Sequence, residues 1–143
     1  MAYWLVKSEP SCWSWDEQVA AGEAGTPWTG VRNHAAKNNL IAMAVGDRAF
    51  FYHSNEGKAV VGIVEVTKTA YPDPTDASGR FVVVDFRAVA PLKTPVTLAA
   101  IKAEPELAAM ELAVNSRLSV QPVRAAEWRR VCAMGGTRPG PQP

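Results

Sequence analysis

The chain has 143 residues, a formal net charge of +1, 48% apolar residues and 20% charged residues. The length favours one domain, and the apolar content excludes a chain that is disordered throughout. The near balance of charge argues against a strongly basic nucleic-acid coat. Tryptophan stands out, because four of the five fall within the first 28 residues.

The first third of the chain predicts one strand and two helices. Ala2–Lys7 is a short aromatic and branched run, which is typical of a strand. Ser14-Trp15-Asp16-Glu17 matches a capping box, which predicts a helix over Trp15–Ala21. Asn33 is a suitable N-cap for a second helix over His34–Ala44.

The middle of the chain is rich in β-forming residues. Arg48–His53 and Ala59–Thr67 flank a five-residue turn that contains glycine, and this pattern predicts a hairpin. Tyr71–Gly79 is dense in turn residues and is predicted to be a loop. A third long strand is predicted over Arg80–Val89, so these segments supply most of a sheet.

The last third of the chain predicts short elements. They are, in chain order, a helix capped by Thr97 over Leu98–Ala103, a helical turn around Leu107–Ala113, a strand over Leu118–Gln121 and a helix over Arg124–Met134. Strands in the middle with helices on either side predict an α+β fold, built on a curved antiparallel sheet or a small barrel. We assign residues 1–136 to this single domain and expect the Pro- and Gly-rich tail 137–143 to be flexible.

Targeting and metal signals are not found in the sequence. The N-terminal segment carries Lys7 and no long apolar stretch, so we expect no secretory signal. No apolar run approaches the roughly 20 residues of a membrane helix. Cys12 and Cys132 lack the spacing of a metal site and are expected to be reduced thiols. The sequence therefore predicts a soluble cytoplasmic protein without a bound metal or a membrane partner.

Motifs for catalysis are missing as well. The sequence has no HExxH, no GxSxG and no phosphate-cradling glycine loop. His53 and Ser54 are adjacent, but neighbouring strand residues point to opposite faces and would not form a catalytic pair. Cys12 has no flanking positive charge that would lower its pKa. These observations make an enzyme a less favoured interpretation of the sequence.

Aromatic and polar residues interleave in the first third of the chain. Trp13, Trp15 and Trp28 lie near two polar stretches, Lys7–Pro10 and Gly30–Asn33. A flat aromatic beside fixed donors and acceptors suits a planar heterocycle, because stacking supplies energy and polar edges supply identity. Tryptophans also serve cores, and we expect Trp15 to pack inward. From chemistry alone, Trp28 is as consistent with a core as with a pocket.

Several motifs occur in order along residues 2–136. They are Tyr3–Pro10 with KSEP, Trp28–Asn33 with GVRN, Gly46–Asn55 with FFYHSN, Ala70–Asp73, Ser116–Pro122 and Glu127-Trp128. Together they resemble the EVE-domain family of the PUA-like superfamily, and in particular its thymocyte nuclear protein-like members. The resemblance implies a PUA-like fold, which is a curved, mostly antiparallel β-barrel with peripheral helices. It also implies recognition of modified bases in DNA or RNA, without a catalytic cofactor.

The resemblance assigns a set of residues to the base-binding pocket. They are Lys7, Ser8, Glu9, Trp28, Val31, Arg32, Asn33, Tyr52, His53, Ser54, Leu118 and Ser119. In such a pocket Trp28 or Tyr52 would stack on an extruded base, and polar groups would contact its hydrogen-bonding edge. The candidates for phosphate contact are Lys7, Arg32 and Lys37.

The function that we expect is a non-catalytic module that binds a modified, flipped base. The sequence leaves the oligomeric state open, and a monomer is favoured. One alternative is an enzyme that acts on a modified nucleotide or nucleoside, with Glu9, Asp47 or His53 as acid or base. Another alternative is a small-molecule or protein-interaction module built on the same pocket.

Overall fold

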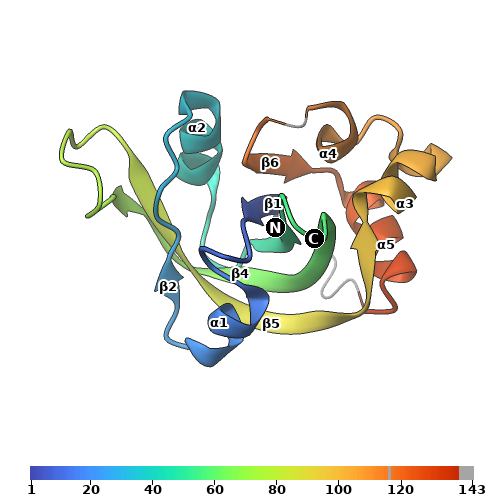
Figure 1. Ribbon diagram of the computed structural model, residues 1–143. Coiled ribbons are helices and arrows are strands. Elements are labelled where there is room, and N and C mark those ends of the chain that lie inside the picture. Colours follow the sequence, from blue (N-terminus) through green and yellow to red (C-terminus); the bar gives the residue numbers. More distant parts are fainter. Residues whose placement is uncertain (116, 139–143) are drawn as a thin grey trace.

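The computed structural model describes residues 1–115 and 117–138 (Figure 1). Its elements are, in chain order, β1 (Tyr3–Ser8), α1 (Trp15–Ala20), β2 (Thr26–Pro27), α2 (His34–Ala42), β3 (Arg48–His53), β4 (Ala59–Pro72), β5 (Val82–Thr97), α3 (Leu98–Ala103), the 3-10 turn η1 (Pro105–Leu107), α4 (Glu111–Val114), β6 (Val120–Val123) and α5 (Ala125–Met134). Of the tail 137–143, only Thr137 and Arg138 lie within the described residues.

One six-stranded sheet forms the centre of the fold, in the order β2-β5-β4-β3-β1-β6. β1 runs parallel to β3, and the other neighbouring pairs are antiparallel. The sheet is mixed and open, so the prediction of a barrel was wrong, whereas the α+β class was right. Closure would require β2 to pair with β6. Each of these edge strands contains a proline, Pro27 or Pro122, which has no N–H for a further ladder.

The strands of the β4–β5 hairpin are longer than predicted. The predicted loop Tyr71–Gly79 begins too early, because Tyr71 and Pro72 still pair with Val83 and Val82. β5 also continues past Val89 to Thr97. Register shifts along the pair let both strands curve, so a strand continues where local composition suggests a turn.

The predicted starts of α1, α2 and α3 are confirmed, and α5 begins at Ala125, one residue later than predicted. Ser14 accepts a hydrogen bond from the backbone N–H of Glu17, whose side chain returns a contact to Ser14, as a capping box requires. The side chains of Asn33 and Thr97 cap α2 and α3 in the same way. The helical turn predicted around Leu107–Ala113 is divided between η1 and α4, and the following short strand begins two residues later than predicted.

Each face of the sheet carries its own apolar core. Alternate residues of β1 point to opposite faces, so Tyr3 and Leu5 enter one core while Trp4 and Val6 enter the other. The first core packs against α3, η1, α4 and α5, and the second packs against α1 and α2. Figure 1 shows α3, α4 and α5 gathered together, with α2 apart from them.

Trp15 serves a core as predicted, and so do Trp4 and Trp128. Trp128 stacks between Tyr3 and Phe50, with ring centroids 4.5 Å and 3.9 Å away. Trp4 donates its indole N–H to the buried Asp47 over 3.1 Å. The six-membered ring of Trp15 lies against β4 at Gly62, where a Cβ atom would overlap it, so this strand position requires glycine.

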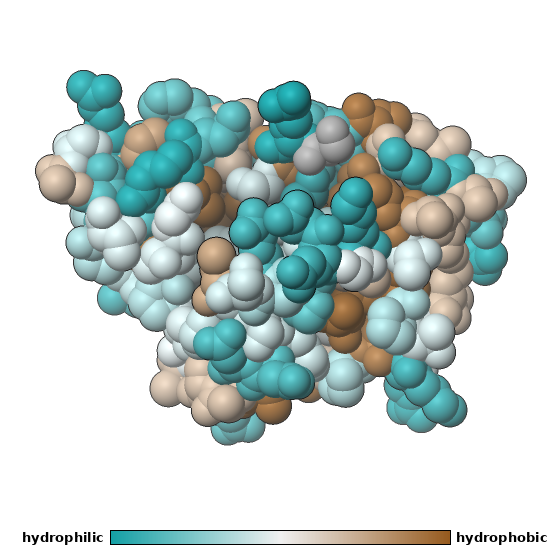
Figure 2. All heavy atoms as spheres, viewed as in Figure 1, coloured by the Kyte–Doolittle hydropathy of each residue, from teal (hydrophilic) through white to brown (hydrophobic). Residues whose placement is uncertain are grey.

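Polar and apolar residues are distributed unevenly over the surface. Hydrophilic residues dominate the centre of the face shown in Figure 2, and apolar residues gather on its right, over α3 and α4. Cys12 is exposed and Cys132 is buried, and they form no disulfide. Burial raises the pKa of Cys132 to about 12. Within residues 1–115 and 117–138, none of the helices has the length and apolar character needed to cross a bilayer.

Candidate functional site

A pocket of about 480 Å³ opens where β1 ends. Two segments that are distant in sequence form its walls: the end of β1 with the loop into α1, and β2 with the loop that follows it. The lining residues are Lys7, Ser8, Glu9, Cys12, Trp13, Thr26, Pro27, Trp28, Thr29 and Gly30. Two indole rings thus share one pocket with hydroxyl, carboxylate, ammonium and backbone groups, and its volume lies in the range of small-ligand sites.

Trp13 is the half-buried aromatic of this pocket. Its indole N–H donates to Oε1 of Gln18 over 2.8 Å, and Nε2 of Gln18 donates to the carbonyl of Phe86 over 3.0 Å. The hydroxyl of Ser8 donates to the carbonyl of Trp13 over 2.6 Å. These contacts hold the ring and its backbone in place without a ligand.

The sequence contained a signal for Trp13, although our reasoning left this residue out of the site. Ser14 is the N-cap of α1, so Trp13 occupies position N′ and Gln18 occupies position N4. Apolar side chains at N′ and N4 often pack together beside a capping box, and here the N4 residue is Gln18, which contacts Trp13 through a hydrogen bond instead. The capping box therefore fixes the position of Trp13 as well as the start of the helix.

Trp28 lines the same pocket but belongs mainly to the core. Its side chain is 7% exposed and meets Phe51 and Phe86 edge-on, with ring centroids 5.4 Å and 5.6 Å away. Its backbone N–H donates to the carbonyl of Val84 over 2.9 Å. Only a small part of the ring is available to a ligand, so the predicted stacking role falls more naturally to Trp13.

A second, smaller pocket of about 200 Å³ adjoins the first and shares Lys7 with it. Tyr52 and Ser54, two other predicted site residues, line this second pocket. The Nζ of Lys7 lies 6.0 Å from the centre of the Tyr52 ring. Burial lowers the pKa of Lys7 and raises the pKa of Tyr52. Six of the twelve predicted base-binding residues thus line one or both of two adjacent pockets.

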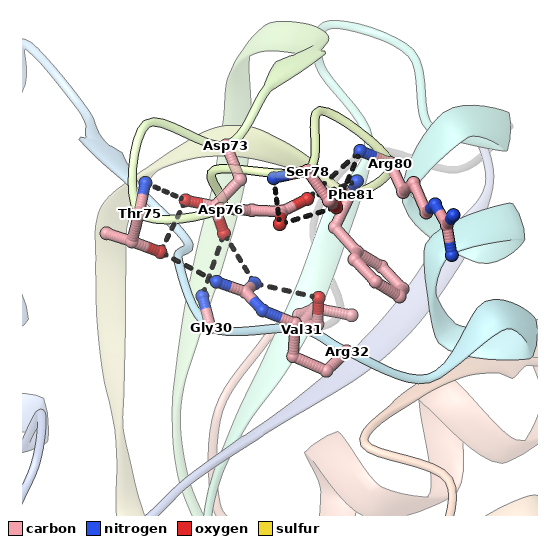
Figure 3. A network of polar contacts seen from close by, with 9 residues as sticks. All are labelled: Gly30, Val31, Arg32, Asp73, Thr75, Asp76, Ser78, Arg80 and Phe81. Atoms are coloured by element: carbon pink, nitrogen blue, oxygen red, sulfur yellow. Dashed lines mark hydrogen bonds and ion pairs between the residues drawn. The ribbon is translucent and has the colours of Figure 1, made fainter.

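Arg32, a predicted phosphate contact, is held in an ion pair with Asp73 (Figure 3). The guanidinium of Arg32 donates to Oδ2 of Asp73 over 2.9 Å, and the backbone N–H of Gly30 donates to the same oxygen over 3.0 Å. The N–H and hydroxyl of Thr75 both donate to Oδ1 over 2.7 Å. This network joins the loop after β2 to the loop between β4 and β5.

The carboxyl of Asp73 is ionised in this network. Burial alone would raise its pKa, but the hydrogen bonds from Thr75, Gly30 and Arg32 outweigh that effect and lower the pKa to about 2. The network orients Gly30, which has a φ of 85°, toward Asp73. Asp73 therefore shapes one wall of the larger pocket without lining it. From the sequence, Asp73 was placed in a motif of the family but was not assigned to the site.

Five further predicted residues are in neither pocket lining and have other contacts within the fold. Val31 is buried in the second core, and the side chain of Asn33 caps α2. The carbonyl of Ser119 accepts a hydrogen bond from the backbone N–H of Lys7 over 3.0 Å. The other two are Leu118, which packs against the second core, and Lys37, whose Nζ lies 5.8 Å from the centre of the Phe81 ring.

His53 holds the start of α1. Its Nε2 accepts a hydrogen bond from the backbone N–H of Trp15 over 3.1 Å, so this nitrogen carries no proton. Burial lowers the pKa of His53, and the nearby Asp16 opposes part of that shift. The imidazole is thus a structural acceptor and is not poised as a base over the pocket.

Acid is expected to destabilise the fold through His53. The pKa of His53 is lower in the folded state than the 6.5 of a free imidazole, so the unfolded chain binds more protons. The stabilisation from neutral His53 is present above pH 6.5 and is lost as the pH falls through the folded-state pKa of His53. Replacing His53 by Phe should cost about 1 kcal/mol at pH 8, because the Trp15 N–H loses its acceptor. Urea unfolding between pH 8 and 5 should then show a weaker pH dependence in this variant than in the wild type. An unchanged dependence would contradict the assignment.

Comparison with known proteins agrees with the fold and the motifs. The family model described as EVE domain matches residues 2–134. Thymocyte nuclear protein 1 of Gallus gallus is 34% identical, over 96% of this chain and 70% of that protein. The NMR structure of Rpa0253 from Rhodopseudomonas palustris has a TM-score of 0.90 and 70% identity, and the match covers 95% of this chain and 94% of that one.

The open sheet with its peripheral helices is a fold shared by EVE and YTH domains. A YTH domain of the Zygosaccharomyces rouxii MRB1 protein, solved with N6-methyladenosine RNA, is 17% identical with a TM-score of 0.57. That match covers 94% of this chain and 86% of the other, and it shows a likeness of fold. The chain belongs to the EVE domain family.

A structure of a relative in the same family was solved with DNA. Human thymocyte nuclear protein 1 was crystallised in complex with DNA that contains 5-methylcytosine. It is 30% identical to this chain, with a TM-score of 0.86, and the match covers 100% of both chains.

Proposed function

We propose that this protein binds a modified base of a nucleic acid in the pocket between Trp13 and Trp28. The single observation that carries the proposal is that pocket, where a fixed, half-buried indole faces polar groups at the end of β1. An aromatic surface with a few placed donors and acceptors suits a planar heterocycle. The complex of the human relative with 5-methylcytosine DNA supports the choice of a methylated base.

The proposed binding is to an unstacked base. Stacking on an aromatic side chain contributes about 1–3 kcal/mol, whereas extruding a base from a duplex costs a few kcal/mol. A modified base in a single strand avoids that cost. We therefore expect tighter binding to single strands, or to duplexes weakened at the modified base, than to intact duplexes.

We also propose that binding occurs without catalysis. The three residues that could act as acid or base have separate surroundings. Asp47 accepts hydrogen bonds from the Trp4 indole and from the backbone of Ala2 and Ala44. His53 accepts from the start of α1, and Glu9 is exposed at the pocket. This arrangement supports a binding role because it provides no acid–base pair.

Removing the Trp13 ring should weaken binding with little effect on folding. Trp13→Ala is expected to reduce affinity for a short single strand with one 5-methylcytosine by about 5- to 150-fold, which corresponds to the 1–3 kcal/mol of one stacked base. Fluorescence anisotropy titrations measure the affinity, with the unmethylated strand measured in parallel.

Trp13→Phe is the matched variant, because it keeps a ring but loses the N–H that contacts Gln18. It should retain most of the affinity. Equal affinity of the wild type for methylated and unmethylated strands would overturn the proposal. So would a Trp13→Ala variant that binds as tightly as the wild type.

A further inference from the structure

Three pockets are linked by lining residues that they share. The larger pocket at the end of β1 shares Lys7 with the second pocket, and the second shares Lys58 and Leu98 with a third. The third pocket has a volume of about 340 Å³ and lies between the β3–β4 turn and α3, and Lys102, in the last turn of α3, is among its lining residues. The shared residues make this a continuous path from the base pocket to α3.

The path beyond the base pocket is cationic. The second and third pockets are lined by Lys7, Lys58 and Lys102, and no carboxylate is among the described residues that line them. Many arginines, by contrast, are engaged within the protein. Ion pairs hold Arg32, Arg48, Arg87, Arg124 and Arg130.

Lys58 and Lys102 are available to an anion from outside. Neither makes an ion pair with any residue in the described part of the chain. Both are exposed, and both belong to elements that the fold holds in place. Lys7 differs from them because it is half-buried, at the junction of the first two pockets.

The turn that carries Lys58 is fixed by backbone contacts. The N–H of Ser54 donates to the carbonyl of Ser8 over 2.9 Å, which attaches the turn to the end of β1. The N–H of Leu98 donates to the carbonyl of Lys58 over 2.8 Å, which attaches it to α3. Asn55 and Lys58 have positive φ angles of 70° and 38°. The turn thus holds Lys58 beside the hydroxyl and amide groups of the second pocket.

We propose that Lys7, Lys58 and Lys102 contact successive phosphates of a single strand whose modified base occupies the pocket beside Trp13. This inference rests on the proposed function and adds the route and direction of the bound strand. The strand leaves the base pocket past Lys7, follows the β3–β4 turn and ends over α3. The arginine that sequence reasoning assigned to phosphate, Arg32, is paired with Asp73 instead.

The test is the salt dependence of binding in lysine variants. Each phosphate contact on a single strand contributes about −0.7 to the slope of log affinity against log salt. Lys58→Gln and Lys102→Gln should each make the slope shallower by about 0.7 and weaken binding about fivefold at 0.1 M salt. The probe is a single strand of ten nucleotides with a central 5-methylcytosine.

Lys93→Gln is the matched control. Lys93 is an exposed lysine of β5 that lines none of the three pockets, and its variant should keep the wild-type slope. Preference for the methylated strand should persist in all three variants. Urea midpoints equal to that of the wild type confirm that each variant is folded.

The two proposals fail in different ways. Preference for the methylated strand, combined with wild-type slopes in Lys58→Gln and Lys102→Gln, would overturn the lysine path and leave the base pocket intact. The opposite result is that the wild type binds methylated and unmethylated strands equally, while the salt slope is still shallower in Lys58→Gln and Lys102→Gln. It would overturn the base pocket and keep the path. Absence of binding to either strand would overturn both.

Discussion

Trp28→Ala is expected to lower the free energy of unfolding by about 3–5 kcal/mol. The indole is 7% exposed and lies edge-on between Phe51 and Phe86, so its removal leaves a cavity between the sheet and the loop after β2. The substitution would also reduce binding, but through the loss of fold as much as the loss of contact. Trp28 is therefore a poor residue with which to test the pocket.

Urea unfolding of Trp28→Ala and Trp28→Phe measures this effect. The phenylalanine variant keeps a ring against Phe51 and Phe86 and should retain most of the stability. Trp13→Ala, by comparison, removes a half-buried ring and should cost much less stability than Trp28→Ala. If Trp28→Ala left the unfolding midpoint unchanged, its assignment to the core would be contradicted.

The second large effect is expected at Asp73. Its folded-state pKa is about 2, well below the 3.8 of an unperturbed aspartate. The difference corresponds to about 2 kcal/mol of stability at neutral pH. Because the unfolded chain binds more protons, this stabilisation is present above pH 4 and is lost as the pH falls toward 2. Asp73→Asn should therefore cost about 2 kcal/mol at pH 7.

The pH dependence identifies the cause of that loss. The stability difference between wild type and Asp73→Asn should shrink between pH 4 and 2, as the wild-type carboxyl becomes protonated. Asp76→Asn is the comparison variant, because Asp76 is in the same loop and its pKa is also lowered to about 2, but its side chain accepts hydrogen bonds only from Ser78, Arg80 and Phe81 of that loop. It should cost less stability than Asp73→Asn, since it does not join the two loops. A constant difference from pH 7 to 2 would contradict the role of the charge.

Local signals in the sequence predicted the helices well. Ser14, Asn33 and Thr97 each cap a helix by contacting a backbone N–H three residues later. Such contacts depend on neighbours in the chain and can be found without knowing the fold. The barrel was wrong because closure depends on two distant edge strands. Pro27 and Pro122 disfavour further pairing at those edges, but this can be recognised only when the order of strands is known.

The site was predicted only in part, for a similar reason. The motifs located Lys7, Ser8, Glu9 and Trp28 at the larger pocket. They could not show that most of Trp28 is buried, because that depends on the partners across the sheet. The partner of Arg32 was also beyond reach, because Asp73 lies 41 residues away in a turn-rich stretch. Sequence spacing identified the segments but not which side chains face the pocket.

The five tryptophans offer the most direct test of the central claim, that a methylated base binds beside Trp13. Each indole N–H gives a separate signal in a ¹H–¹⁵N spectrum, and single Trp→Phe variants assign them. Trp13 lines the pocket, whereas Trp128 lies in the other core between Tyr3 and Phe50. Titration with a 5-methylcytosine strand should shift the Trp13 signal most and Trp128 little, and the unmethylated strand should shift Trp13 less at equal concentration. An unmoved Trp13 signal at saturation would contradict the account.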